Sequence, residues 1–332
     1  MQPQLQNTTL QFYPKGSAGK RLFALWFFTC LMIVWNILGH TFLGFEQPWA
    51  SPIVAIGTAV VMQLLLEWVD ARARHRPVRF LGSGANFVNS LPPALIPGFA
   101  CGMLIYSNER MLPLVFAVVL SIASKVLIRA PVGQGRTQHV FNPSNFGVAA
   151  TLVLFASSVG FAPPYHFTQN LDGIWHWIVP GFILCTGIVV HAFGTGRLPL
   201  VLAWVIGFMG QGLIRVHHMN AAVTDPSYLI PWQVPLMPMT SAAFVVFTLY
   251  MVPDPATTPI HPLRQILFGL AVAAVYGVLQ EMKIVFGLFF ALVAVCAVRG
   301  ASLWIYAGWR RWLAAGAPSA EFEKQEARPA AV

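Results

Sequence analysis

Apolar runs of about 20 residues recur along the whole chain. A helix of this length is what crosses the hydrocarbon core of a bilayer. Only 9% of the 332 residues are charged, whereas a soluble domain carries about 25%. The sequence therefore predicts an integral, all-α polytopic membrane protein with about ten transmembrane helices. The runs are residues 22–44, 51–70, 87–106, 112–128, 144–161, 173–192, 198–216, 238–252, 265–281 and 284–306.

The basic residues indicate how these runs are oriented. If the N-terminus is cytoplasmic, 17 of the 20 Lys and Arg fall on the inner side, with Lys125 near the end of its run counted as inside, and the exceptions are Arg110, Arg215 and Lys283. This asymmetry is the positive-inside pattern of multi-pass proteins. It predicts a protein of the inner (cytoplasmic) membrane with both termini in the cytoplasm. It also explains the net charge of +9 without a nucleic-acid partner.

Two polar stretches that contain proline, residues 139–147 and 251–270, each precede an apolar run. Pro253 and Pro255 lack backbone donors, so no helix continues through the second stretch. Such a break is tolerated at membrane depth only where protein or a water-filled cavity surrounds it. The two stretches lie in corresponding halves of the chain, which predicts a site between two repeats.

Dividing the chain near residue 165 gives five runs in each half. An odd number of spans per half gives the halves opposite orientations, so the expected fold is a pair of inverted five-helix repeats. The expected segments are a cytoplasmic N-terminal segment (1–21), the first repeat (22–161), an outer loop (162–172), the second repeat (173–306) and a partly disordered cytoplasmic tail (307–332).

Asp254 is the first candidate site residue, because an acidic group near membrane depth is costly and usually faces a cavity. Thr257 and Thr258 place hydroxyls beside it. Alternatively, the carboxylate caps the next helix or pairs with Arg264.

Asn142, Ser144 and Asn145 begin the fifth run, where free amides point at an anionic group. They are candidates for binding a phosphate or the edge of a ring, with help from Arg129 and Arg136. Plain helix capping by Asn142 or Ser144 is the alternative. Asn86 and Asn89, just before Pro92 and Pro93, offer the same function in the same half.

Two motifs carry a resemblance to a known family. Phe141-Asn142-Pro143 opens a span and is followed by Gly147, and residues 240–257 are small and aromatic residues that end in Pro253-Asp254-Pro255-Ala-Thr257. These motifs resemble the NqrB/RnfD family of membrane electron-transport subunits, including relatives associated with enediyne biosynthesis. Pro253 stands where that family usually has threonine.

The resemblance implies ten helices in two inverted repeats, similar to the architecture of urea transporters. It also implies FMN attached to the threonine of a Ser-Gly-Ala-Thr sequence after the fifth span. The loop 162–173 has no such motif, and Ser83-Gly84-Ala85-Asn86 ends in asparagine. We therefore expect FMN or riboflavin to bind without a covalent bond, or a quinone in its place, with partner subunits that carry other redox centres.

Several other residues have simpler interpretations. The four cysteines lie in apolar runs and are expected to be small buried side chains. His217, His218, His166 and His176 are read as loop histidines at the membrane surface rather than as metal or haem ligands. Glu67 and Asp70 are expected to pair with Arg72 and Arg74.

Three functions are compatible with these features. The first is an electron-transfer subunit that holds flavin or quinone between its repeats. The second is a small-molecule transporter or channel with the same inverted-repeat fold, and the third is a scaffold in a larger membrane complex. Whether the protein is an enzyme stays open at this point.

Overall fold

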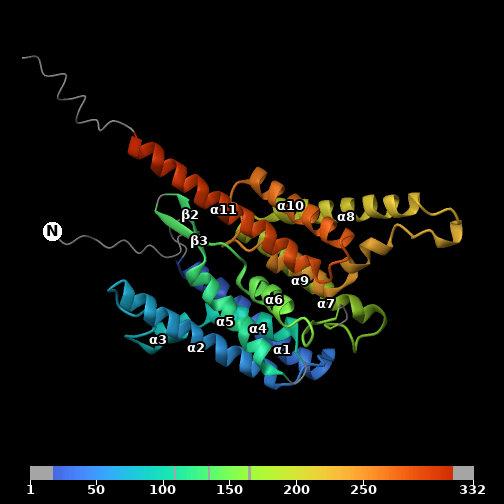
Figure 1. Cartoon of the computed structure of the whole chain (residues 1–332). Coiled ribbons are helices and arrows are strands. Elements are labelled where there is room, and N and C mark those ends of the chain that lie inside the picture. Colours follow the sequence, from blue (N-terminus) through green and yellow to red (C-terminus); the bar gives the residue numbers. More distant parts are fainter. Residues whose placement is uncertain (1–17, 108–109, 134, 164–165, 317–332) are drawn as a thin grey trace, which may run out of the picture.

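The computed structural model is built almost entirely of helices (Figure 1) and describes residues 18–107, 110–133, 135–163 and 166–316. The predicted tail from residue 317 and the segment before residue 18 lie outside the described residues. The elements of the first half are α1 (Ala18–Leu38), η1 (Gly39–Leu43), α2 (Ala50–Ala73), α3 (Gly84–Ser90), α4 (Pro92–Leu104), β1 (Ile105–Tyr106), α5 (Met111–Leu127), β2 (Arg129–Gly133), β3 (Arg136–His139), α6 (Pro143–Leu154) and β4 (Gly160–Phe161).

Within the described residues, the second half contains helices and no strands. Its elements are η2 (Gly173–Trp177), α7 (Ile178–Val189), η3 (Val190–Thr195), α8 (Leu198–Ala221), η4 (Pro226–Tyr228), η5 (Val234–Thr240), α9 (Ala242–Val246), η6 (Phe247–Met251), α10 (Pro262–Glu281) and α11 (Gly287–Gly316).

Within the described residues, seven helices are long and apolar enough to cross a membrane. One further pair, Val234–Thr240 and Ala242–Met251, meets this criterion together but bends by 74° at its break. Two shorter apolar helices, Met111–Leu127 and Pro143–Leu154, complete the set. These elements confirm a multi-pass helical membrane protein.

Proline in the first turn begins several of these helices. Pro92, Pro143, Pro199 and Pro262 occupy the first or second position of α4, α6, α8 and α10. A proline there loses no helical hydrogen bond, because the first amides of a helix have no partner within it. The same residues that stop an approaching helix therefore start the next one.

Small residues let the helices approach closely in both halves. A Cβ at Gly147 of α6 would overlap the Ser121 hydroxyl and the Ala117 carbonyl of α5. A Cβ at Gly269 of α10 would lie 2.6 Å from the Leu200 carbonyl oxygen of α8. Close backbone packing of this kind stabilises helix pairs in membranes, where the hydrophobic effect between helices is weak.

The first-half helices gather on one side of the molecule and α7, α8, α9 and α10 on the other (Figure 1). α11 passes between these groups, packing on α6 and β2 as well as on α10. The antiparallel β2–β3 hairpin pairs Arg129 with His139. This hairpin and the start of α6 thus bring a first-half segment against the second half.

The third run is interrupted in each half of the chain. In the first half it divides at Leu91 into α3 and α4, beside Pro92 and Pro93. Its second-half counterpart divides at Ser241, where the side-chain oxygen accepts a hydrogen bond from the Phe244 amide. The proline-rich segment before Ser241 is the short helix η5.

Two expectations about single residues are wrong. His166 is not a loop histidine at the surface: its side chain is 1% exposed and stacks on Phe45, with ring centroids 3.7 Å apart. All four cysteines are free thiols, but Cys30 and Cys185 are exposed on the sides of α1 and α7 instead of buried. Both helices are apolar enough to cross a membrane, so these thiols lie on lipid-accessible faces.

Candidate functional site

The segment from Pro253 to Thr258 folds into a compact turn beyond η6. The Asp254 carbonyl accepts hydrogen bonds from the amides of Thr257 and Thr258, both at 3.1 Å. The Asp254 carboxylate in turn accepts from the Ala256 amide (3.0 Å) and the Thr257 hydroxyl (3.3 Å). Since Pro253 and Pro255 cannot donate, these bonds define the turn. Asp254 is therefore fixed in place by its own loop.

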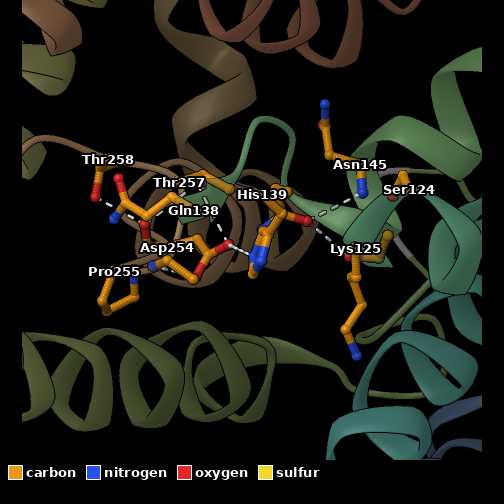
Figure 2. Close-up of polar contacts among 12 residues, drawn as sticks. Ser124, Lys125, Gln138, His139, Asn145, Asp254, Pro255, Thr257 and Thr258 are labelled. Carbon is orange, nitrogen blue, oxygen red and sulfur yellow. Dashed lines mark hydrogen bonds and ion pairs between the residues drawn. The ribbon is translucent and has the colours of Figure 1, made fainter. Parts of the chain in front are cut away.

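His139 of the first half faces Asp254 of the second. The His139 Nε2 lies 3.7 Å from an Asp254 carboxylate oxygen, and Figure 2 shows the two side chains directed at each other. Burial would raise the pKa of Asp254, but the His139 imidazole and the hydrogen bonds of the loop hold it below its usual value. Asp254 is thus a buried carboxylate that stays ionised at neutral pH.

Arg197 approaches the same loop from the start of α8. Its Nε donates to the Thr258 hydroxyl at 3.0 Å, and one terminal nitrogen donates to the Pro255 carbonyl at 3.4 Å. The Arg197 side chain is 4% exposed, and Thr257 and Thr258 are equally buried. These hydrogen bonds tie the buried guanidinium to the loop that holds Asp254.

We call His139, Arg197, Asp254, Thr257 and Thr258 the Asp254 cluster. It joins segments that are more than a hundred residues apart in the sequence. Lys125 of α5 is drawn in the same view but extends away from Asp254 (Figure 2), and it donates to the Pro93 carbonyl at 2.5 Å.

Asn142, at the start of α6, contacts the end of η6, three residues before Asp254. Its side-chain oxygen accepts from the Asn145 amide and the Ser144 hydroxyl, which is the capping geometry that the sequence allowed. Its amide nitrogen donates to the Met251 carbonyl at the end of η6 (3.1 Å). Asn145 donates similarly to the Phe289 carbonyl of α11 (3.1 Å). Asn142 and Asn145 therefore connect the halves as well as capping a helix.

Three buried amide side chains around this region each leave one atom without a hydrogen bond. They are Gln138 (Nε2), Asn145 (Oδ1) and Gln265 (Oε1). In each, the other amide atom is fixed by a partner: Gln138 accepts from Arg299, Asn145 donates to Phe289 and Gln265 donates to the Ile260 carbonyl. Leaving a buried polar atom unpaired costs about 1–3 kcal/mol. Such atoms indicate a place for water or for a ligand.

The structure brings most of the predicted residues together but not all. Asn142, Ser144, Asn145, Asp254, Thr257 and Thr258 surround the junction of the two halves. Arg136 is exposed in β3, two residues before the buried Gln138.

Asn86 and Asn89 are exposed on α3. They take no part in the contacts of the Asp254 cluster described above. The Asn86 amide group donates to the Leu81 carbonyl, and Asn89 accepts from the Trp26 indole. These bonds are local or lead to α1, so the structure gives neither asparagine a contact with the Asp254 cluster.

Sequence reasoning missed His139, Arg197, Gln138 and Arg299. His139 and Gln138 had a signal, since they open the polar stretch before Phe141-Asn142-Pro143. Arg197 looked like an ordinary basic residue of an inside loop, and Arg299 lies within the predicted run 284–306. Asp254 pairs with His139 rather than with Arg264, and α10 begins at Pro262, too far along for Asp254 to cap it.

The described residues contain no group of three or more His, Cys, Asp and Glu side chains that could hold a metal ion. No protein-family model matches the chain, and no curated protein matches it. The NqrB/RnfD resemblance stays a prediction.

Proposed function

We propose that this protein is a membrane electron-transfer subunit that binds a flavin, without a covalent bond, at the Asp254 cluster between two inverted repeats. The observation that carries the proposal is the junction itself. An ionised carboxylate and the unpaired amide atoms of Gln138 and Asn145 lie where the halves meet, while a buried arginine binds the Asp254 loop and a third unpaired amide atom, that of Gln265, lies on α10. A membrane protein that only needed to hold its halves together would be more stable with apolar packing there.

The packing of the helices supports the inverted-repeat part of the proposal. In the first half α4 packs on α1 and α5 packs on α2 and α6; in the second half α9 packs on α7 and α10 packs on α8 and α11. Each half also divides its third span. Seven long apolar helices, one bent pair and two shorter apolar helices support a division into five spans in each half.

The unpaired atoms favour a flavin over a quinone. Two of them, Asn145 Oδ1 and Gln265 Oε1, are acceptors, and one, Gln138 Nε2, is a donor. Asp254 adds a further acceptor. The edge of a flavin ring offers both N–H donors and carbonyl acceptors, whereas a quinone offers only acceptors. A ligand with both donors and acceptors can form hydrogen bonds with all of these atoms.

The residues of the cluster have separable tasks in this account. Asp254, Asn145 and Gln265 would accept hydrogen bonds from the ring edge, and Arg136 and Arg197 would attract a phosphate. The flavin supplies the electron transfer when bound, and the protein supplies binding, orientation and electrostatics. His139 would set the local charge beside the ring. Partner subunits with other redox centres complete the electron path.

The test is the absorbance spectrum and intact mass of the protein purified in detergent, before and after denaturation. We expect a flavin spectrum that is released on denaturation, with an unmodified chain mass. A mass increase that stays with the chain would mean covalent attachment and would contradict the proposed mode of binding. A colourless protein that also fails to bind added FMN, riboflavin and a short-chain quinone would overturn the proposed function.

One observation favours a second candidate, a small-molecule transporter or channel. The 74° bend at Ser241 produces the kind of discontinuous helix that lines transport sites near the midplane. Uptake of flavins or urea-like solutes into proteoliposomes distinguishes the two. Flux that is lost in an Asp254→Asn variant would favour transport, and the absence of flux with bound flavin would favour electron transfer.

A further inference from the structure

A pocket of about 450 Å³ lies at the end of α2, away from the Asp254 cluster. Its lining includes the apolar residues Trp68, Val78 and Leu81. It also includes Arg72, His75 and Arg76. A pocket lined by apolar and by basic residues, at the end of a helix that is apolar enough to span a membrane, has the composition of the membrane interface.

The positive charge of this region is only partly neutralised. Arg76 is held by Glu67 (2.6 Å) and Asp70 (2.6 Å), and Arg74 also pairs with Asp70 (2.7 Å). The sequence led us to expect Arg72 in this network as well, and that expectation is wrong. Four arginines of residues 72–79 thus face two carboxylates.

Arg72 is the cation that remains available. Among the described residues it has no ion pair, and its guanidinium carbon lies 5.8 Å from the centroid of the Trp68 ring. A cation over an indole face is held by the ring electrons while its other donors stay free. Arg72 is exposed, so those donors can reach an anion in the pocket.

Arg72 also ends an apolar stripe of α2. Val61, Leu65 and Trp68 precede it at helical spacing, and they are 64%, 49% and 47% exposed. Residues at this spacing share one face of a helix. Because α2 is apolar enough to span a membrane, this exposed face is covered by lipid tails. The stripe therefore leads from the bilayer interior directly to the guanidinium.

We propose that this pocket binds the headgroup of an anionic glycerophospholipid, with an acyl chain along the stripe of Val61, Leu65 and Trp68. Arg72 contacts the phosphate, with His75 beside it, and Trp68 separates the headgroup from the acyl chain. The excess positive charge selects an anionic lipid over a zwitterionic one. The apolar lining residues and the stripe favour a lipid over a free phosphate, because a phosphate would leave these apolar side chains uncovered.

The experiment measures lipid binding to the full-length protein in detergent. Native mass spectrometry counts bound lipids during titration with phosphatidylglycerol, phosphatidylcholine or inorganic phosphate alone. The same titrations are followed by thermal unfolding. We expect phosphatidylglycerol to bind and to raise the unfolding temperature, with phosphatidylcholine and phosphate having little effect.

Three variants locate the site. Arg72→Gln should weaken phosphatidylglycerol binding about five-fold, since one interfacial arginine contributes about 1 kcal/mol. Trp68→Leu should weaken it by a smaller factor. Arg310→Gln, which removes an exposed arginine from α11, is the matched control and should change binding less than two-fold. Arg72 has no structural ion pair to lose, so its variant should fold.

Three results would overturn the proposal. Equal binding of phosphatidylglycerol and phosphatidylcholine would remove the role of charge. Stabilisation by inorganic phosphate to the same extent would show that the pocket takes a free anion and not a lipid. Equal losses in Arg72→Gln and Arg310→Gln would show general attraction to a basic surface.

Discussion

Glu46 and Asp254 each connect segments that are distant in the sequence, but of the two only Asp254 is buried. Glu46 accepts hydrogen bonds from Tyr106 and Gln169, which are far from it in the sequence. Asp254 is bound by His139 and by its own loop. Glu46 is exposed to solvent, whereas Asp254 is buried.

The two carboxylates differ in the free energy that their contacts require. Glu46 connects β1 to the segment of Gln169 while water still solvates its charge, so this contact has a small desolvation cost. The Asp254 cluster instead removes a carboxylate and a guanidinium from water and leaves amide atoms nearby unpaired. Connecting the two halves does not require buried charges or unpaired amide atoms. A site that positions donors and acceptors for a ligand does require them.

The largest expected effect comes from Asp254→Asn. The variant removes the buried negative charge that faces His139, and we expect the free energy of unfolding to fall by about 3 kcal/mol. Ligand binding should be lost as well. Chemical denaturation in detergent measures the first effect and flavin titration the second.

Glu46→Gln is the matched control for that variant. It changes an exposed carboxylate to the same kind of amide, so both stability and ligand binding should stay close to those of the wild-type protein. If the two variants lose equal stability, burial does not explain the difference between Glu46 and Asp254.

Arg197→Ala should be the next most severe change. It removes the hydrogen bonds to the Thr258 hydroxyl and the Pro255 carbonyl, and we expect a loss of about 2 kcal/mol in the free energy of unfolding. Arg197→Lys keeps the charge but not the planar donor group, so it should restore only part of the loss. Full restoration by lysine would mean that charge alone matters here.

Falling pH should act on His166 before it acts on the Asp254 cluster. Burial lowers the pKa of His166 from 6.5 to about 4, with His40 and Glu46 as its titratable neighbours. The unfolded chain binds a proton at this histidine below pH 6.5 and the folded chain does not. Stability is therefore lost as pH falls from 6.5 towards 4, by about 2 kcal/mol at pH 5.

The pKa of Asp254 lies below its usual 3.8, so this carboxylate stays ionised over the same pH range. His166→Gln should flatten the loss of stability between pH 7 and pH 5, and thermal unfolding at each pH measures it. An unchanged pH dependence in that variant would assign the acid sensitivity to another group.

Gln47→Leu should have the smallest effect of the series. Gln47 is buried and donates to the carbonyls of Met103 (3.3 Å) and Ile105 (2.7 Å), but its own side-chain oxygen is unpaired. Replacing it with an apolar side chain loses one donor and removes one unsatisfied atom, so we expect a loss of about 1 kcal/mol in the free energy of unfolding. Ligand binding at the Asp254 cluster should not change, and a change there would contradict the separation of the two regions.

The spans and their interruptions could be predicted from the sequence. Apolar length depends on composition alone, and Pro92, Pro93, Pro253 and Pro255 remove backbone donors wherever they occur. The turn at Asp254 was predictable for the same reason. The capping role of Asn142 could also be predicted, because a capping residue and its helix are adjacent in the chain.

The partners of Asp254 were not predictable in this way. His139 lies 115 residues away and meets the carboxylate only because the β2–β3 hairpin packs beside α11 and the second half. Arg197 was counted with the orienting charges of the inside loops, and nothing local marks it as buried. Asn86 resembled Asn142 in its proline context, but α3 is exposed and its asparagines bond elsewhere. Side-chain burial depends on tertiary packing, which short-range sequence patterns do not contain.

The most direct test of the account is a flavin titration of the purified protein, with quenching of flavin fluorescence as the readout. The account predicts saturable FMN binding to the wild-type protein and to Glu46→Gln, and no measurable binding to Asp254→Asn at the same protein concentration. Equal binding by Glu46→Gln and Asp254→Asn, in protein that is folded by thermal unfolding, would contradict the assignment of the Asp254 cluster as the ligand site.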